Sequence, residues 1–270
     1  MRGIIPAILM FLSTSLSAFN PSYYDLNRPV GSKISVNFEQ MENVGYVSGI
    51  VKKLNEAIAK DPDNVGLYVM RNEYLYLLWD IAPVDKKIYY AKLGLRAAEE
   101  TIKKFPDHPD GWINKAIFLG VYGLSKGVLN ALSVAKEMRI CALKAYKMNK
   151  TYYYAQPPQI LGRLYFKLPS FPVSFGDLEK ARRYLYEAYR IDPTYPYTYM
   201  YIAELEAATG NIDKAKKFIL DISNIKPRTY FEVLIKKWTL RTQKKALHML
   251  GEKLDRYNYD FLLDPLRHQK

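Results

Sequence analysis

Apolar residues recur along most of the chain at intervals of three and four, a spacing that predicts α-helices with at least one buried face. The clearest runs cover residues 67–79, 111–122, 160–166 and 197–208. No stretch alternates between apolar and polar residues and is flanked by turn residues, as a half-buried strand would be. The pattern therefore predicts an all-α protein.

A recurring helix end divides this pattern into units. At five places a residue that faces a helix-packing seam is followed, five positions later, by a residue that we call a stop because a helix is expected to end just before it. Four of the five stops are proline, which lacks an N–H and disfavours helix in the residue before it. The five stops are Pro62, Pro106, Lys150, Pro193 and Pro227. Their separations are 44, 44, 43 and 34 residues. The last spacing is that of a tetratricopeptide repeat, a helical hairpin of about 34 residues.

The interior of the last unit agrees with this interpretation. Ala203 and Ala215 supply small residues at which two helices can approach closely, and Gly210–Asn211 supplies the turn. The earlier units are nine or ten residues longer, and the surplus falls between their two helices. We therefore expect a tetratricopeptide-like helical-hairpin solenoid with inserted loops along one edge of the stack. The expected insertions lie at Ile81–Asp85, Gly120–Asn130 and Lys167–Asp177.

The two ends of the chain differ from this repeat. Residues 1–18 have one arginine, a short apolar run and then small residues, the order of a secretory signal peptide. No cysteine follows it, so we expect a periplasmic or secreted protein without a lipid anchor. Residues 19–45 read as an irregular lead-in, 46–228 as helical repeats and 229–270 as basic helices that cap the open end.

The composition limits which binding partners, metals and cofactors the chain can have. The 270 residues are 49% apolar and carry a formal net charge of +13. A basic surface attracts nucleic acid, anionic lipid or an acidic protein, but export argues against nucleic acid. The single cysteine, Cys141, excludes an internal disulfide and a thiolate-based zinc site, and the three histidines lie far apart. We therefore expect no metal and no cofactor.

One motif suggests an enzyme and fails in context. Gly123–Gly127 reads GLSKG and matches the G-x-S-x-G nucleophile elbow. The elbow requires a strand before the serine and a helix after it, whereas the residues before Gly123 are predicted to be helical. A bend between two helices is the better interpretation, and we expect no enzymatic activity.

Aromatic residues mark a candidate binding edge. The insertion Lys167–Asp177 contains Phe171 and Phe175, which either fold onto the core or line a groove. The tyrosine-rich runs at 152–154 and 193–201 suit packing between stacked helices better than a ligand cage, although tyrosine also suits a partly hydrated wall. The candidate ligand-binding residues are Trp112, Tyr122, Tyr154, Arg163, Tyr165, Phe171 and Phe175.

The stretch Tyr152–Pro193 resembles the TatT component of TRAP transporters, periplasmic helical proteins with degenerate tetratricopeptide repeats. The similar segments are LGRLYFKLP at Leu161–Pro169, SFGDLEKA at Ser174–Ala181 and GWINKAIFLG at Gly111–Gly120. The likeness extends from about Asn55 to Ile222. Members of that family are often lipoproteins, and this chain departs from them in lacking the cysteine.

The resemblance implies a periplasmic accessory subunit of a solute uptake system. Such a subunit would form homo-oligomers and dock an extracytoplasmic solute-binding protein, and its interior would hold or channel a hydrophobic or organic-acid solute. The alternative is a generic repeat scaffold in the cell envelope that holds a protein or peptide. An aromatic-lined edge favours the first interpretation, and a charged groove favours the second.

Overall fold

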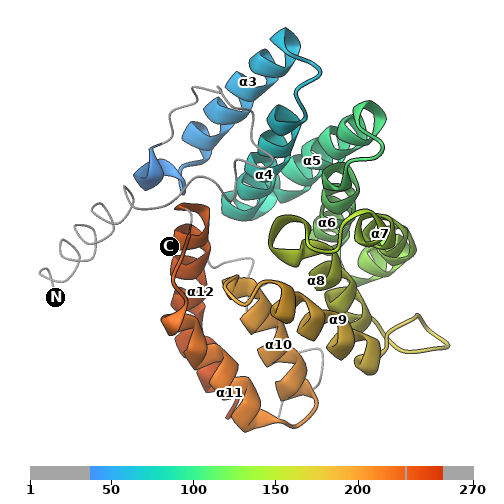
Figure 1. Cartoon of the computed structure of the whole chain (residues 1–270), viewed down its shortest axis with the longest axis vertical. Helices are drawn as coiled ribbons and strands as arrows, with labels where there is room; N and C mark the ends of the chain where they lie inside the picture. The colour runs from blue at the N-terminus through green and yellow to red at the C-terminus, as the bar shows by residue number, and fades with distance from the viewer. Residues whose placement is uncertain (1–36, 229, 252–270) are drawn as a thin grey trace, which may run out of the picture.

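The computed structural model describes residues 37–228 and 230–251, so the predicted signal peptide, the lead-in up to residue 36 and the last 19 residues lie outside it. The described residues form ten α-helices and two short 3-10 helices, without a strand. This confirms the expected all-α helical-repeat fold (Figure 1). The helices are α3 (Val44–Lys60), α4 (Val65–Ile81), α5 (Val84–Lys104), α6 (Pro109–Ser125), α7 (Val128–Met148), α8 (Tyr152–Lys167), α9 (Leu178–Ile191), α10 (Pro196–Ala208), α11 (Ile212–Asp221) and α12 (Tyr230–Met249), with 3-10 helices η2 (Phe38–Gln40) and η3 (Ile222–Asn224).

The helices alternate between an inner and an outer layer. Helices α4, α6, α8 and α10 are the first of each hairpin and are enclosed on most sides: eleven of the 13 residues of α10 are buried. The odd-numbered helices bury a single face, as in α9, where four of 14 residues are buried. The hairpins are stacked in a ring, so that the inner helices surround a common interior (Figure 1).

The predicted stops mark the ends of the outer helices. In the first four units each outer helix ends two residues before the stop, at Lys60, Lys104, Met148 and Ile191. In the last unit α11 runs into η3, and the stop Pro227 follows three residues after η3. The stop is a reliable signal because proline restricts its predecessor to extended backbone.

Two of the three expected loop insertions are wrong. The surplus residues of the first two units lengthen their helices: α4 and α5 have 17 and 21 residues, against 13 and 10 in α10 and α11. Only two residues join α4 to α5, because Pro83 ends one helix and begins the next. Gly127, with a φ of 103°, does the same between α6 and α7. A ten-residue loop follows α8, where Pro169 and Pro172 prevent helix.

Small residues lie at the helix seams as expected. Ala203 and Ala215 are fully buried. A Cβ atom added to Gly162 would lie 2.6 Å from Cγ of Leu185, so α8 and α9 approach closely at this glycine. Gly210, with a φ of 83°, makes the turn between α10 and α11.

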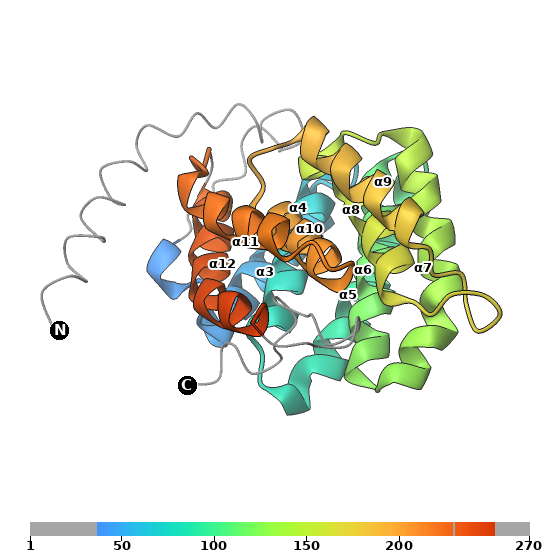
Figure 2. The same cartoon turned by 90° about the horizontal axis from the view of Figure 1, so that it is seen from below.

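The stack closes on itself. In both views the last helix, α12, returns to the start of α3 (Figures 1 and 2). Glu42, just before α3, accepts hydrogen bonds from Nε1 of Trp238 at 2.9 Å and from Nη1 of Arg241 at 2.8 Å. Nζ of Lys237 lies 3.5 Å from the same carboxylate. One carboxylate therefore joins residues almost 200 positions apart.

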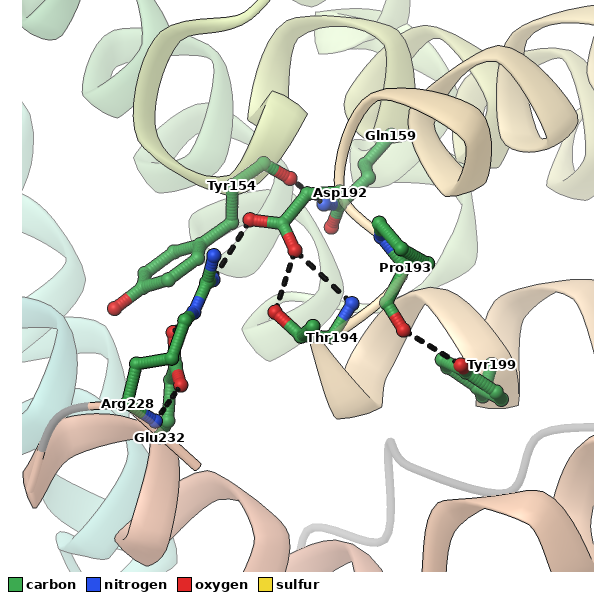
Figure 3. A network of polar contacts seen from close by, with 8 residues as sticks. All are labelled: Tyr154, Gln159, Asp192, Pro193, Thr194, Tyr199, Arg228 and Glu232. Atoms are coloured by element: carbon green, nitrogen blue, oxygen red, sulfur yellow. Dashed lines mark hydrogen bonds and ion pairs between the residues drawn. The ribbon is translucent and has the colours of Figure 1, made fainter. Parts of the chain in front are cut away.

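A second polar network fixes the start of α12 (Figure 3). Arg228 pairs with Asp192, at the end of α9, at 2.8 Å and with Glu232 in α12 at 2.7 Å. Asp192 also accepts hydrogen bonds from the backbone N–H and the hydroxyl of Thr194. Burial would lower the pKa of Arg228, but the hydrogen bonds and charges of both acids outweigh it and raise that pKa. Within the region predicted as a cap the structure describes α12 (Tyr230–Met249), and residues 252–270 lie outside the described part of the chain.

Candidate functional site

The interior of the stack contains a cavity of about 770 Å³. Its wall is built by inner helices α4, α6, α8, α10 and α12, with α7 and the start of the loop after α8 closing one side. Helices α4, α6, α8 and α10 are buried on most sides, so those of their wall positions that do not pack against a neighbour face the cavity. The volume falls in the range of small-molecule sites.

One end of the cavity is apolar. It lies between the second halves of α6 and α8 and the facing part of α7. Here Ala135, Leu164 and Leu168 form a buried cluster against which Leu132 and Met138 pack. The apolar wall residues at this end are Gly120, Val121, Leu124, Leu132, Ala135, Met138, Leu164, Leu168 and Pro169.

The other end is polar and aromatic. It lies between the first halves of the same two inner helices, α6 and α8, which a hydrogen bond from the hydroxyl of Tyr152 to Oδ1 of Asp110 joins at 3.3 Å. The wall residues of this kind are Glu73, Tyr76, Asp110, Asn114, Tyr153, Gln156, Gln159, Tyr195, Tyr197 and Tyr201. The cavity wall therefore has an apolar part and a polar, aromatic part, and the basic residues Arg163 and Lys167 of α8 line it as well.

Asp110 is the more deeply buried of the two acids in this wall, with 4% of its surface exposed. Nδ2 of Asn72 donates to its Oδ2 at 2.8 Å, and Asn72 also bonds Thr101 on α5. Burial raises the pKa of Asp110, and the hydrogen bonds and the nearby His108 only partly oppose this. Burial likewise lowers the pKa of His108. The polar end thus contains a carboxyl group that burial destabilises when ionised.

Two basic wall residues are paired with an acid behind them. Arg163 and Lys167 both line the cavity, one turn apart on α8. Arg163 forms a salt bridge to Glu204 on α10, and Nζ of Lys167 lies 3.3 Å from the same carboxylate. Glu204 is fully buried. Arg163 also lies 4.4 Å from the ring centre of Tyr201.

A left-handed turn shapes the polar end. Tyr153, Tyr154 and Ala155 have φ angles of 44°, 59° and 57°. Such a conformation costs roughly 1–2 kcal/mol for each non-glycine residue, so it needs support from its surroundings. Tyr154 is stacked on Tyr195 with ring centres 4.6 Å apart, and its carbonyl accepts from Gln159 (Figure 3). Tyr153 and Gln159 thereby take their places in the wall.

Of the seven predicted ligand-binding residues, Arg163 lines this cavity. The Trp112 indole donates to the carbonyl of Pro106 at 2.9 Å, outside the cavity wall. Tyr122 lies beside Lys126, whose Nζ is 4.8 Å from the ring centre. Tyr154 is buried under the wall and supports it from behind. These three side chains are not part of the cavity wall.

The three remaining residues belong to the loop region. Tyr165 is stacked on Tyr184, and Phe175 packs edge-on against Tyr165 with ring centres 5.8 Å apart. Phe175 also lies beneath Arg139, 4.1 Å from its guanidinium carbon. Phe171 is 89% exposed. The two phenylalanines therefore behave differently. Phe175 folds onto the core and Phe171 faces solvent, and neither lines the cavity.

Sequence reasoning missed most of the wall. The sequence predicts packing for Tyr195, Tyr197 and Tyr201 and singles out neither Asp110 nor Gln159. The available signal was the near-continuous apolar character of the inner helices, because a polar residue inside such a helix must face either a buried partner or a cavity.

A family model described as tetratricopeptide repeat matches residues 173–234, which include α9, α10 and α11 and the first residues of α12. A comparison with curated proteins finds no match. Together the fold and this match define a tetratricopeptide-like helical-repeat protein. Such repeats generally mediate protein–protein interactions, which indicates an interaction scaffold, and no catalytic family is indicated.

Two classes of feature are absent from the described residues. No helix among them is long and apolar enough to cross a membrane. The same part of the chain contains no group of three or more His, Cys, Asp or Glu side chains that could hold a metal ion. The GLSKG motif lies at the end of α6, where the hydroxyl of Ser125 donates to the carbonyl of Val121 at 2.7 Å.

Proposed function

We propose that this protein is an exported accessory subunit of a TRAP-type solute uptake system and binds a hydrophobic solute in its central cavity. The observation that carries the proposal is the cavity itself. A scaffold that only held peptides would need an open inner groove, whereas here α12 and α3 close the stack around an interior of about 770 Å³. The resemblance to TatT supports the transport context.

Binding in the cavity is tested with a neutral fluorescent probe, N-phenyl-1-naphthylamine. Ile117, in the cavity wall, is changed to Trp to fill the space, and Ile140, which is 54% exposed on α7, receives the same change as a control. We expect the probe to bind the wild type and Ile140→Trp equally and to bind Ile117→Trp at least tenfold more weakly. Equal binding by all three would place the probe elsewhere and contradict the proposal.

The transport partner is tested separately. If a solute-binding protein is encoded beside this gene, the two purified proteins should form a complex of defined stoichiometry in sedimentation experiments. Absence of a complex at micromolar concentrations would contradict a role in a TRAP-type system.

Export is tested by sequencing the N-terminus of protein recovered from the periplasm, where cleavage near Ser17 or Ala18 is expected. An intact Met1 on cytoplasmic protein would contradict export.

A generic scaffold remains the second candidate because of the loop after α8. Phe171 and Val173 are 89% and 71% exposed at its tip, and large apolar side chains exposed together often mark a protein contact. If Phe171→Ala abolished binding of the solute-binding protein while the cavity bound no probe, the scaffold function would be the better description.

A further inference from the structure

The cavity has a polar end and an apolar end, and the charges at the polar end decide which head group it accepts. This inference rests on the proposed function, because it concerns the ligand of the same cavity. The first halves of α6 and α8 carry Asp110, Asn114 and Gln156, whereas their second halves carry only apolar wall residues apart from Arg163 and Lys167.

The polar end carries two acids, although Arg163 of the wall lies 4.4 Å from the ring centre of Tyr201 at that end. Glu73 and Asp110 both line it. The side chains that donate to the Asp110 carboxylate, those of Asn72, Tyr152 and Asn114, are neutral. Within the described residues no Lys or Arg forms a salt bridge with Asp110. A buried carboxylate without a cationic partner is costly, and a bound cation would supply that partner.

The basic wall residues are unsuited to an anionic head. Arg163 and Lys167 share one carboxylate, that of the fully buried Glu204. A ligand carboxylate that took Arg163 would compete with Glu204 for its cation. Lys167 would remain beside Glu204, so the cost is that of weakening a buried charge network and not of leaving Glu204 unpaired. This competition disfavours an organic acid at this position.

Aromatic rings complete the polar end. Tyr153, Tyr195 and Tyr197 lie in the same part of the wall as the acids, and the ring centres of Tyr195 and Tyr197 are 5.7 Å apart. The face of an aromatic ring attracts an ammonium group, which is the basis of aromatic cages for quaternary amines. Carboxylates and tyrosine rings together favour a cation.

We infer that the cavity binds an amphiphile with an ammonium head group, held among Asp110, Glu73 and the tyrosines, with its hydrocarbon tail between α6, α7 and α8. Burial raises the pKa of Asp110 although His108 lies nearby, and among the described residues no lysine or arginine forms a salt bridge with it. Such a ligand leaves the Arg163–Glu204 pair intact.

The test compares three ligands with the same ten-carbon tail, each used below its micelle-forming concentration to displace N-phenyl-1-naphthylamine. We expect decyltrimethylammonium to bind at least tenfold more tightly than decanoate, with decanol between them. Asp110→Asn should weaken decyltrimethylammonium about tenfold and leave decanol within twofold. The matched control Asp107→Asn removes an exposed acid three residues away and should change neither.

Glu204→Gln provides an independent arm, because it releases Arg163 and Lys167 and should strengthen decanoate binding. If Asp110→Asn fails to fold, Glu73→Gln takes its place. Decanoate binding as tight as that of the ammonium ligand would overturn the head-group inference while leaving the proposed cavity function standing. Failure of all three ligands to displace the bound probe would overturn the head-group inference, whereas equal probe binding by the wild type and Ile117→Trp would overturn both.

Discussion

At the scale of single residues, the small side chains at helix seams were predictable and the cavity wall was not. Ala203 and Ala215 were expected at close approaches, and both are fully buried. A seam has a sequence signature because only a small residue fits there. Asp110 and Gln159 have no such sequence signature, because their burial depends on hydrogen-bond partners that the sequence does not reveal. Two partners of Asp110 lie tens of positions away on other helices, and Gln159 bonds the carbonyl of Tyr154 in the left-handed turn.

Gly162 provides a prediction at this scale. Gly162→Ala should lower the stability of the fold by about 1–3 kcal/mol, since the new methyl group would lie 2.6 Å from Cγ and 3.1 Å from the backbone N of Leu185. Gly49 is the control, because an added Cβ there meets nothing within 4 Å on an exposed helix position. Gly49→Ala should raise stability by about 0.5–1 kcal/mol. Urea unfolding measures both, and equal effects would refute the close approach.

The two loop phenylalanines should also behave differently. Phe171→Ala should leave the melting temperature within a degree or so of wild type, because its side chain is 89% exposed. Phe175→Ala removes contacts with Tyr165 and Arg139 and should lower it clearly. Neither change should alter binding of the neutral probe, because neither ring lines the cavity. Differential scanning fluorimetry and probe titration measure the two effects, and a loss of probe binding in either variant would show that the loop reaches the cavity.

At the scale of elements, the ends of the outer helices were predictable because each precedes a residue that stops a helix. The lengths of the inner helices were not. Surplus residues between two recognisable helices can form a loop or extra helical turns, and a single proline such as Pro83 does not distinguish the two. In the first two units the surplus is helical, and in the third Pro169 and Pro172 make a loop.

The last helix gives the prediction at this scale. A chain that ends at Arg228 lacks α12 and therefore uncovers the apolar surfaces of α10 and α11, on which Leu234, Ile235 and Trp238 of α12 are buried. We expect it to aggregate, because terminal repeats need a polar outer face. Size-exclusion chromatography and thermal melting of the shortened and full chains make the comparison. A soluble shortened chain with a cooperative melt would mean that α12 is not the cap.

At the scale of the whole molecule, the closure of the stack lay beyond sequence reasoning. An open solenoid and a closed one have the same helix signals, and the difference is in the small rotation between successive pairs. The residues that make the closing contact are Glu42 and three side chains of α12, 195 to 199 positions away. Ordinary charged residues at that separation carry no local pattern.

The closing contact should depend on pH. Burial alone would raise the pKa of Glu42, but the Trp238 N–H and the charges of Lys237 and Arg241 outweigh it and lower that pKa. A carboxyl with a lowered folded-state pKa stabilises the fold above its unfolded pKa and loses this contribution as the pH falls through the folded value. Glu42→Gln should therefore be less stable than wild type at pH 7 by about 0.2–1 kcal/mol, and the difference should vanish in acid.

Urea unfolding at a series of pH values from 7 to 3 measures this difference. Glu39→Gln, a change to an exposed acid of η2, is the control and should behave as wild type throughout. A Glu42→Gln difference that stayed constant with pH would show that the carboxylate charge does not stabilise the closure.

Closure at Glu42 also limits how this protein can change in evolution. Open repeat arrays gain and lose units readily, because each unit touches only its neighbours and a duplication merely lengthens the array. Here an added or deleted hairpin would move α12 away from the Glu42 carboxylate and so prevent the closing contact. The number of hairpins is therefore fixed by geometry, and relatives of this chain should differ in the lengths of individual helices and loops while keeping the same number of repeats.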